Sequence, residues 1–210
     1  MTRLIAALIF TLFLSPVLGA VGLEDLLSAV KTNDVPRANE LLSKGMEPSS
    51  ADPQGYSLLM YAAREGHLDM IEMLLQKGAK VNARNFVGET AIMLAAYRGN
   101  LESVKLLYSR AARIDEPGAW GPLHYAAIEG RSEVVRYLLE QGASIDAPAP
   151  NGATALMLAA RGGHTNTVKT LLDRGADPAR KTDSGATALQ WAETANHSDA
   201  AKLLKQKLKN

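Results

Sequence analysis

The chain of 210 residues contains no cysteine and carries almost equal numbers of opposite charges, with 23 lysines and arginines against 22 aspartates and glutamates. The lack of cysteine excludes disulfides, thiolate metal ligands and thiol nucleophiles, so stability must come from packing. It also agrees with an oxidising compartment, where a free thiol can mispair. The two charge signs are scattered without long blocks of either. Because duplex nucleic acids are bound by concentrated basic faces, we expect no nucleic-acid partner.

Motifs of the common catalytic sites are also missing. The sequence has no Gly-x-Ser-x-Gly, no His-Glu-x-x-His and no phosphate-binding glycine loop. The histidines are spaced too widely to converge on one tetrahedral ion, and we expect them to be hydrogen-bonded structural residues. They are His67, His124, His164 and His197. We therefore expect no catalytic residue, no cofactor and no metal site, and a hydrolase or metal enzyme built on an insertion stays a remote alternative.

Long apolar runs are confined to the N-terminus. Residues 4–14 are apolar with one interruption, and Pro16 would break a helix. Small residues follow at the positions that a signal peptidase inspects, which predicts a signal peptide over residues 1–20 with cleavage after Gly19 or Ala20. The alternative is a membrane anchor, but a spanning helix needs about 20 apolar residues and this run has roughly half as many. After cleavage, we expect a formally neutral chain without stable membrane insertion.

What the sequence does contain is a six-residue pattern that recurs five times. The copies begin at Leu58, Ala91, Pro122, Ala155 and Ala188, and four of them end in a pair of alanines. The second residues of successive copies are separated by 33, 31, 33 and 33 residues. A period of this length predicts a stacked array in which each unit contacts only its neighbours. Such an array presents a long continuous surface, and we expect binding and not catalysis.

The second unit shows how one repeat should fold. Residues 58–65 are predicted to form a short helix, and Gly66 and His67 a turn into a second helix with an apolar face. Gly78 then ends this second helix, because the left-handed backbone just past a helix end is reached cheaply only by glycine. The polar segment 80–85 would project outward as a hairpin finger.

These residues resemble the signature of ankyrin repeats, which is Gly-x-Thr-Pro-Leu-His-x-Ala-Ala-x-x-Gly-His, then Leu-Leu, then Gly-Ala-x-x-Asn-Ala. Segments 152–156 and 185–189 keep the threonine and leucine, segment 122–127 keeps the proline and histidine, and segment 138–147 matches the later half. The resemblance recurs in register over nearly all of the chain after residue 20. It implies an all-α repeat solenoid, a right-handed stack of helix pairs with short hairpin fingers on one side and a concave surface that binds proteins.

The repeat divides the chain into seven segments. The signal peptide is followed by an N-terminal capping unit, four repeats and a C-terminal capping unit. Their boundaries are 1–20, 21–52, 53–85, 86–118, 119–149, 150–182 and 183–210. The charged outer side of the first unit and the lysines of the last helix suit the two ends of a stack.

Two departures from the pattern fall in the connection between the third and fourth units, which is two residues short. Ala111 stands where other units have glycine. Because a left-handed alanine costs on the order of 1 kcal/mol, we expect a reshaped helix end there. The shortened loop 116–121 brings Trp120 to the tip or base of a finger. Trp120 is either a binding hot spot, as exposed tryptophans often are, or a plug for the space that the shorter loop leaves.

In ankyrin repeats, partner contacts usually come from the finger around its glycine and from the two positions after the alanine pair. Carried over to this sequence, the resemblance implies a binding face with aromatics in the middle units and small residues in the later ones. The implied partner-binding residues are Gln54, Tyr56, Arg64, Glu65, Phe86, Val87, Glu89, Tyr97, Arg98, Trp120, Ile128, Glu129 and Arg161. Tyr61 and Tyr125 are instead predicted to be core, because that repeat position commonly carries a large packing side chain.

Together these features predict an exported, non-catalytic and monomeric module that binds one protein through its concave face and fingers. The short secretion signal and the compact repeat domain resemble small periplasmic members of the family, so we expect the bacterial periplasm, with a secreted form as the alternative. The partner would be an envelope protein or enzyme that the chain scaffolds, protects or inhibits. A further alternative is an effector or immunity-type protein that binds a host or competitor target, although the C-terminus shows no recognisable secretion signal.

Overall fold

The computed structural model describes residues 15–115 and 118–209 of the chain. Within these residues there are twelve helices, and the one β-bridge is isolated. The helices follow one another as six pairs: α1 (Ser15–Lys31) and α2 (Val35–Ser43), α3 (Leu58–Glu65) and α4 (Leu68–Gln76), α5 (Ala91–Arg98) and α6 (Leu101–Ser109), α7 (Pro122–Ile128) and α8 (Ser132–Glu140), α9 (Ala155–Arg161) and α10 (Thr165–Asp173), α11 (Ala188–Thr194) and α12 (Ser198–Lys207).

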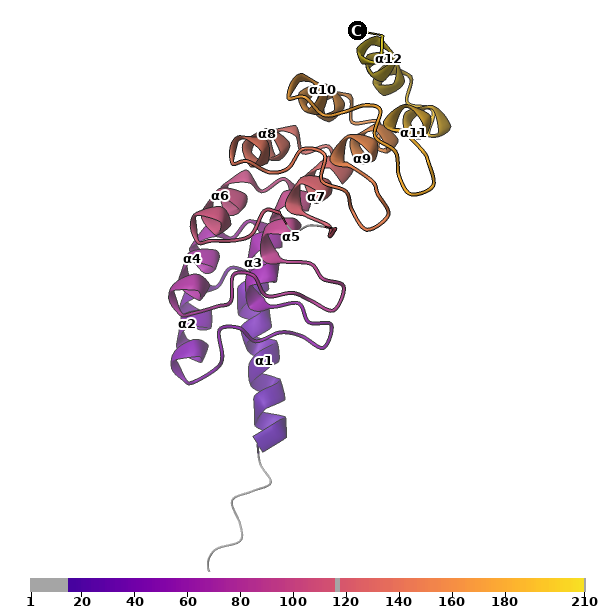
Figure 1. Ribbon diagram of the computed structural model, residues 1–210. Helices are drawn as coiled ribbons and strands as arrows, with labels where there is room; N and C mark the ends of the chain where they lie inside the picture. The colour runs from indigo at the N-terminus through magenta and orange to yellow at the C-terminus, as the bar shows by residue number, and fades with distance from the viewer. Residues whose placement is uncertain (1–14, 116–117, 210) are drawn as a thin grey trace, which may run out of the picture.

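Each pair packs on the next, which builds two layers of helices (Figure 1). The first helices of the pairs form an inner layer, from α1 to α11, and the second helices form an outer layer, from α2 to α12. The loops between pairs extend beyond the inner layer as fingers, and the array curves toward the side of these fingers (Figure 1). The predicted all-α repeat solenoid is therefore confirmed.

The second pair folds as the sequence predicts. The Ser57 hydroxyl accepts a hydrogen bond from the backbone N–H of Met60 at 3.2 Å, so a polar cap starts α3. Gly66, with φ of 80°, ends it. Alanines follow the large apolar residues of the inner helices and let neighbouring helices approach closely. In four pairs these alanines have no exposed surface: Ala62 and Ala63, Ala95 and Ala96, Ala126 and Ala127, Ala159 and Ala160.

Neighbouring pairs are also linked by hydrogen bonds from the residue that precedes the outer helix. His67 Nδ1 lies 3.2 Å from the carbonyl oxygen of Val30, and His164 Nε2 lies 2.7 Å from that of Ile128. Asn100 donates to two carbonyl oxygens of α3 in the same way. The structural role predicted for these two histidines is confirmed, because each one fastens its unit to the preceding inner helix.

The helix end at Ala111 is not reshaped, and that prediction was wrong. Ala111 adopts φ of 65°, next to values of 92° and 88° for the glycines at the same position, Gly78 and Gly142. The Asn82 amide donates to the Ala111 carbonyl oxygen at 3.0 Å, and its oxygen accepts from the Arg113 N–H at 2.9 Å. Two bonds from the preceding unit thus hold the left-handed turn.

The predicted signal peptide largely lies outside the described residues, which begin at Ser15. Pro16 is the second described residue of α1, which continues past it to Lys31 without a break. None of the helices in the described residues combines the length and the apolarity needed to cross a bilayer.

Candidate functional site

In two of the fingers, an aspartate or asparagine side chain fixes the turn by accepting hydrogen bonds from backbone N–H groups of the same finger. In the finger before α3, Asp52 Oδ1 accepts from the N–H groups of Gln54 and Tyr56, both at 2.9 Å. In the finger before α5, Asn85 Oδ1 accepts from the N–H groups of Val87 and Glu89 at 3.1 and 2.8 Å. Such turns are typical of aspartate and asparagine. The residues at the tip are left to point outward.

The tip of the finger before α5 is strongly apolar and exposed. Phe86 exposes 81% and Val87 78% of its surface, the largest values among the exposed large apolar residues of the described chain. Neither side chain is needed to form the turn. An apolar pair at this exposure makes the finger tip a candidate contact surface.

Glu89, at the base of the same finger, connects three consecutive units. Its Oε2 accepts from the Tyr56 hydroxyl of the preceding unit at 2.9 Å and from the Asn85 amide at 2.6 Å. Its Oε1 accepts from the Tyr125 hydroxyl of the following unit at 3.1 Å. All three donors are neutral groups, so none of them is an ion-pair partner, and both carboxylate oxygens accept hydrogen bonds.

Two tyrosines bind this carboxylate and three further aromatic residues contact those tyrosines. We call the five residues the aromatic patch: Tyr56, Tyr61, Tyr97, Trp120 and Tyr125. The rings of Tyr97 and Tyr125 meet edge to face with centroids 6.3 Å apart, and those of Trp120 and Tyr125 do so at 6.4 Å. Tyr56 and Tyr61 form a second contact at 5.9 Å. Rings that fix one another in this way form a rigid surface that loses little entropy on binding.

Tyr61 and Tyr125 are only in part the core residues that the sequence predicts. Their rings pack against the core, but both side chains are half-buried and their hydroxyls reach the inner face. The Tyr61 hydroxyl donates to Asp52 Oδ2 at 2.6 Å. Burial and the Asp52 carboxylate together raise the pKa of Tyr61 to about 12, and burial and Glu89 raise the pKa of Tyr125. The phenols therefore stay protonated as donors.

Asp52 is the second carboxylate bound to the aromatic patch. Burial acts to raise the pKa of Asp52, but hydrogen bonds from the Tyr61 hydroxyl and from the backbone N–H groups of Tyr56 and Gln54 outweigh it and lower the pKa below its ordinary value. Asp52 is thus an anion that orders both the finger turn and the Tyr61 ring. The pattern of the sequence alone did not identify it, since its role depends on a tyrosine nine positions away.

Trp120 is half-buried and contacts two residues of its own unit. Its ring packs edge to face on His124 at 5.6 Å and on Tyr125. His124 is held at 2.9 Å from the Ala147 carbonyl oxygen, and its Nδ1 accepts from the Gly121 N–H at 3.1 Å. Trp120 therefore takes part both in packing beside the shortened loop and in the aromatic patch.

The remaining predicted contact residues are less uniform. Arg64 and Glu65 pair with each other at 2.9 Å, and Arg98 is exposed beside Tyr97. The Glu129 carboxylate raises the pKa of the Tyr97 hydroxyl through a hydrogen bond. The Ile128 side chain packs against the core. Gln54 is exposed at the tip of its finger, whereas Arg161 lies far along the array, with its guanidinium 4.9 Å from the ring centroid of Trp191.

Trp191 was missed by the sequence reasoning, and a comparison of repeat positions could have found it. It occupies the fourth place of the six-residue pattern, as do Tyr61 and Tyr125. Leucines at this place are almost fully buried, with exposures of 7% at Leu94 and 2% at Leu158. An aromatic ring is longer than a leucine side chain, so it extends past the core onto the inner face.

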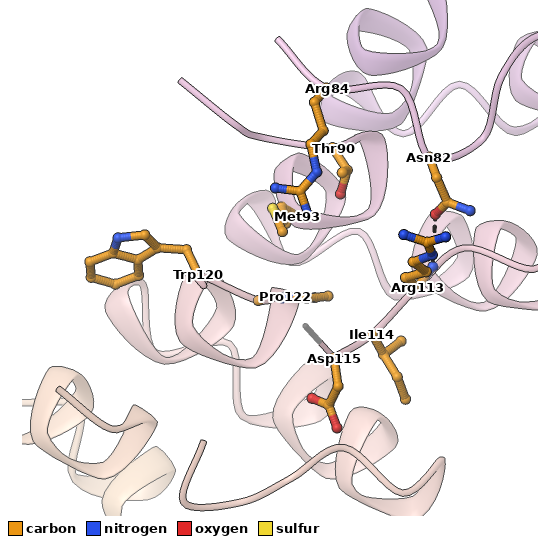
Figure 2. A pocket seen from close by; sticks show the side chains of 10 residues that line it. Asn82, Arg84, Thr90, Met93, Arg113, Ile114, Asp115, Trp120 and Pro122 are labelled. Atoms are coloured by element: carbon orange, nitrogen blue, oxygen red, sulfur yellow. Dashed lines mark hydrogen bonds between the residues drawn. The ribbon is translucent and has the colours of Figure 1, made fainter. Parts of the chain in front are cut away.

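A small hollow lies between the third and fourth pairs, beside the shortened connection (Figure 2). Asn82 and Arg113 line one side, while the Trp120 side chain extends away from them (Figure 2). The Thr90 hydroxyl in its wall is buried and has no hydrogen-bond partner among the described residues. Asn82 already bonds to the connection, and Asp115 accepts from Ser144. The polar groups here mainly serve to join successive units.

The described residues contain no cluster of three or more His, Asp or Glu side chains that could hold a metal ion. The candidate site is instead the aromatic patch with the finger tip of Phe86 and Val87, which includes three of the exposed large apolar residues, Phe86, Val87 and Tyr97. Its geometry allows recognition of another molecule by contact: rigid rings, an exposed apolar tip and two ordered carboxylates.

Comparison with known protein families gives a match over most of the chain. A family model described as ankyrin repeats, in three copies, matches residues 19–85, 83–149 and 145–210, and these segments cover most of the chain. Each matched segment spans two of the helix pairs. A search among curated proteins found no match to the chain.

Proposed function

Because this chain belongs to the ankyrin-repeat family, whose repeats generally mediate protein–protein interaction, we propose that it captures a protein partner with its middle units. The contact surface would be the aromatic patch together with Phe86 and Val87. The family is typically not enzymatic, and the chain would act by occupying or organising a surface of its partner.

The observation that carries this proposal is the exposed tip of Phe86 and Val87 beside an ordered ring cluster. Binding energy at protein interfaces is concentrated in a few aromatic anchors that are already fixed before the partner arrives. Tyr97 and Trp120 meet that description, since both rings are partly exposed and both contact Tyr125. The tip would add apolar area at the edge of the same surface.

We further propose that the protein is exported and acts as a monomer in a bacterial periplasm, on an envelope protein or enzyme that it scaffolds, protects or inhibits. The apolar segment 4–14, the small residues before Val21 and the lack of cysteine support export. Intact-mass measurement of the chain purified from its source cells tests this part directly. A mass that still includes residues 1–20 would contradict it.

Affinity capture from an envelope extract tests the binding function. The bait is the chain with a tag after Asn210, compared with the double variant Tyr97→Ala and Trp120→Ala. Loss of two anchors should weaken capture by a few kcal/mol without changing the helical circular-dichroism signal. Trp191→Ala, which removes an aromatic of the same face in the last pair, is the matched control and should capture the partner normally.

Equal loss of folding and capture in the double variant would instead mark Tyr97 and Trp120 as packing residues. A partner retained by the double variant but lost by Trp191→Ala would move the binding surface to the C-terminal units. If the extract yields no partner and culture supernatant or foreign cells do, the effector or immunity-type function is favoured over the envelope role.

A further inference from the structure

Glu89 differs from the glutamates at the ends of the inner helices α3, α7 and α11, each of which has a basic partner. Glu65 pairs with Arg64 at 2.9 Å, Glu129 lies 3.7 Å from Arg131, and Glu193 pairs with Lys205 at 2.7 Å. Among the described residues, no lysine or arginine forms an ion pair with Glu89, whose bonds come from two phenols and one amide. Its negative charge is oriented but not neutralised.

The aromatic ring beside it, Tyr125, also differs from its equivalents in other units. Tyr61, at the same repeat position, has the Lys31 ammonium 4.3 Å and the Arg64 guanidinium 5.3 Å from its ring centroid. Trp191, again at this position, is covered by Arg161 at 4.9 Å. Such distances are those of cation–π contacts. Two of the three aromatics at this place therefore bind a cation from the chain itself.

The sequence explains why Tyr125 has no such cation among the described residues. The arginine over Tyr61 comes from three residues further along the same helix, and in the fourth unit that place is Ile128. The arginine over Trp191 comes from the position after the alanine pair of the preceding unit, and for Tyr125 that place is Tyr97. Both sources of a cation are replaced by uncharged residues in the unit that follows Glu89, a carboxylate without an ion pair in the described part of the chain.

We infer that the partner supplies the missing cation: a lysine or arginine side chain of a partner segment binds between the Glu89 carboxylate and the rings of Tyr125 and Tyr97, while an adjacent apolar side chain lies on Phe86 and Val87. The inference rests on the proposed binding function and names the chemistry that this function would recognise. An ionised carboxylate has about four acceptor directions, of which three are used, so one remains for the incoming N–H.

Selection from a random peptide library displayed on phage tests this site without knowledge of the partner. The target is the purified chain, and the readout is the amino-acid composition of the selected peptides. We expect enrichment of a lysine or arginine next to a large apolar residue. Glu89→Gln keeps an acceptor for the tyrosine hydroxyls but removes the charge, and it should abolish the enrichment of basic residues. Glu133→Gln, at an exposed carboxylate on outer helix α8, should not.

Tyr97→Arg is a second variant that does not depend on the folding of Glu89→Gln. It places an arginine where the fifth pair has Arg161, so the chain would fill its own site and basic peptides should no longer be selected. Replacing the basic residue of one selected peptide by glutamine should weaken its affinity about tenfold, by isothermal titration calorimetry. Melting temperatures and circular dichroism check that all variants fold.

Three results would overturn the inference: selected peptides without a basic residue, equal enrichment on Glu89→Gln or Tyr97→Arg, or no peptide selected at all. None of these results decides whether the chain binds a protein partner, because the affinity capture described above tests that function separately. If the peptide selection fails in one of these ways but the unmodified chain still captures a partner that the Tyr97 and Trp120 double variant loses, then the proposed binding function stands and only the cation site is rejected.

Discussion

The middle helix pairs, α3 to α8, and the last two pairs, α9 to α12, have the same backbone fold but carry different side chains on their fingers. The finger before α5 has Phe86, Val87 and Glu89, whereas the equivalent places in the two later fingers are held by small or polar residues. Those residues are Pro150, Asn151 and Ala153, and Asp183, Ser184 and Ala186. Turn glycines and buried alanines build the fold in both regions, so the face could diverge without changing it.

The largest effect should come from removing the carboxylate that links the middle units. Glu89→Ala leaves two tyrosine hydroxyls and the Asn85 amide without their acceptor in a partly buried place, which should lower the free energy of unfolding by about 2 kcal/mol. The later pairs have alanine at this position and need no such link. Urea denaturation followed by circular dichroism measures the loss.

A double-mutant cycle with Tyr125→Phe sharpens this result. The phenylalanine removes only the hydroxyl that donates to Glu89, so the two changes should be coupled by on the order of 1 kcal/mol. Glu133→Ala, which removes an exposed carboxylate, should change stability by less than about 0.5 kcal/mol. Additive effects at Glu89 and Tyr125 would show that the carboxylate does not connect the units.

The next effect is a pH dependence of stability that comes from His124 in the fourth unit. His124 is buried, and burial lowers its pKa below the usual 6.5, although hydrogen bonds to the carbonyls around it oppose the shift. The folded state therefore favours neutral His124. The stability that comes from this preference is fully present above pH 6.5, the usual pKa, and is lost as the pH falls through the lower pKa of the folded state. This one site changes the free energy of unfolding by at most about 1.4 kcal/mol per pH unit.

His124→Met makes this unit like its neighbours, which have Met60, Met93 and Met157 at the same position. Below about pH 6.5, the free energy of unfolding of the variant should fall less steeply with pH than that of the unmodified chain. Urea denaturation at several pH values measures this difference. The same slope in the variant and the unmodified chain would assign the acid sensitivity to other groups.

The sequence was sufficient to predict the fold, because the fold depends on residues that repeat. The spacing of the six-residue pattern, the alanine pairs and the turn glycines recur in register, and one unit predicts the rest. The prediction failed at Ala111, where the residue type argued against a left-handed turn. The bonds from Asn82 that hold this turn join residues about 30 positions apart, and a local argument does not contain them.

The candidate site was predicted only in outline. Phe86 and Val87 could be identified from their place in the finger, but the role of Glu89 depends on hydroxyls contributed by units on both sides. Tyr61 and Tyr125 were assigned to the core because the position usually packs, and ring length carries them onto the inner face as well. Contacts between units thus determine the site, whereas contacts within a unit determine the fold.

The smallest expected effect is that of replacing the left-handed Ala111, which tests whether its backbone strain lowers the stability of the middle units. Ala111→Gly should raise the free energy of unfolding by about 0.5–1 kcal/mol, because glycine reaches φ of 65° without strain but loses more entropy on folding. Gly142→Ala and Gly175→Ala should lower it by a similar amount, since an added Cβ at either place meets no atom within 4 Å and only the backbone is strained. Thermal unfolding of the three variants under one condition gives the comparison. If Ala111→Gly is neutral while the other two lose stability, then the bonds from Asn82 already offset the strain, and Asn82→Ala should cost more in the unmodified chain than in the Ala111→Gly background.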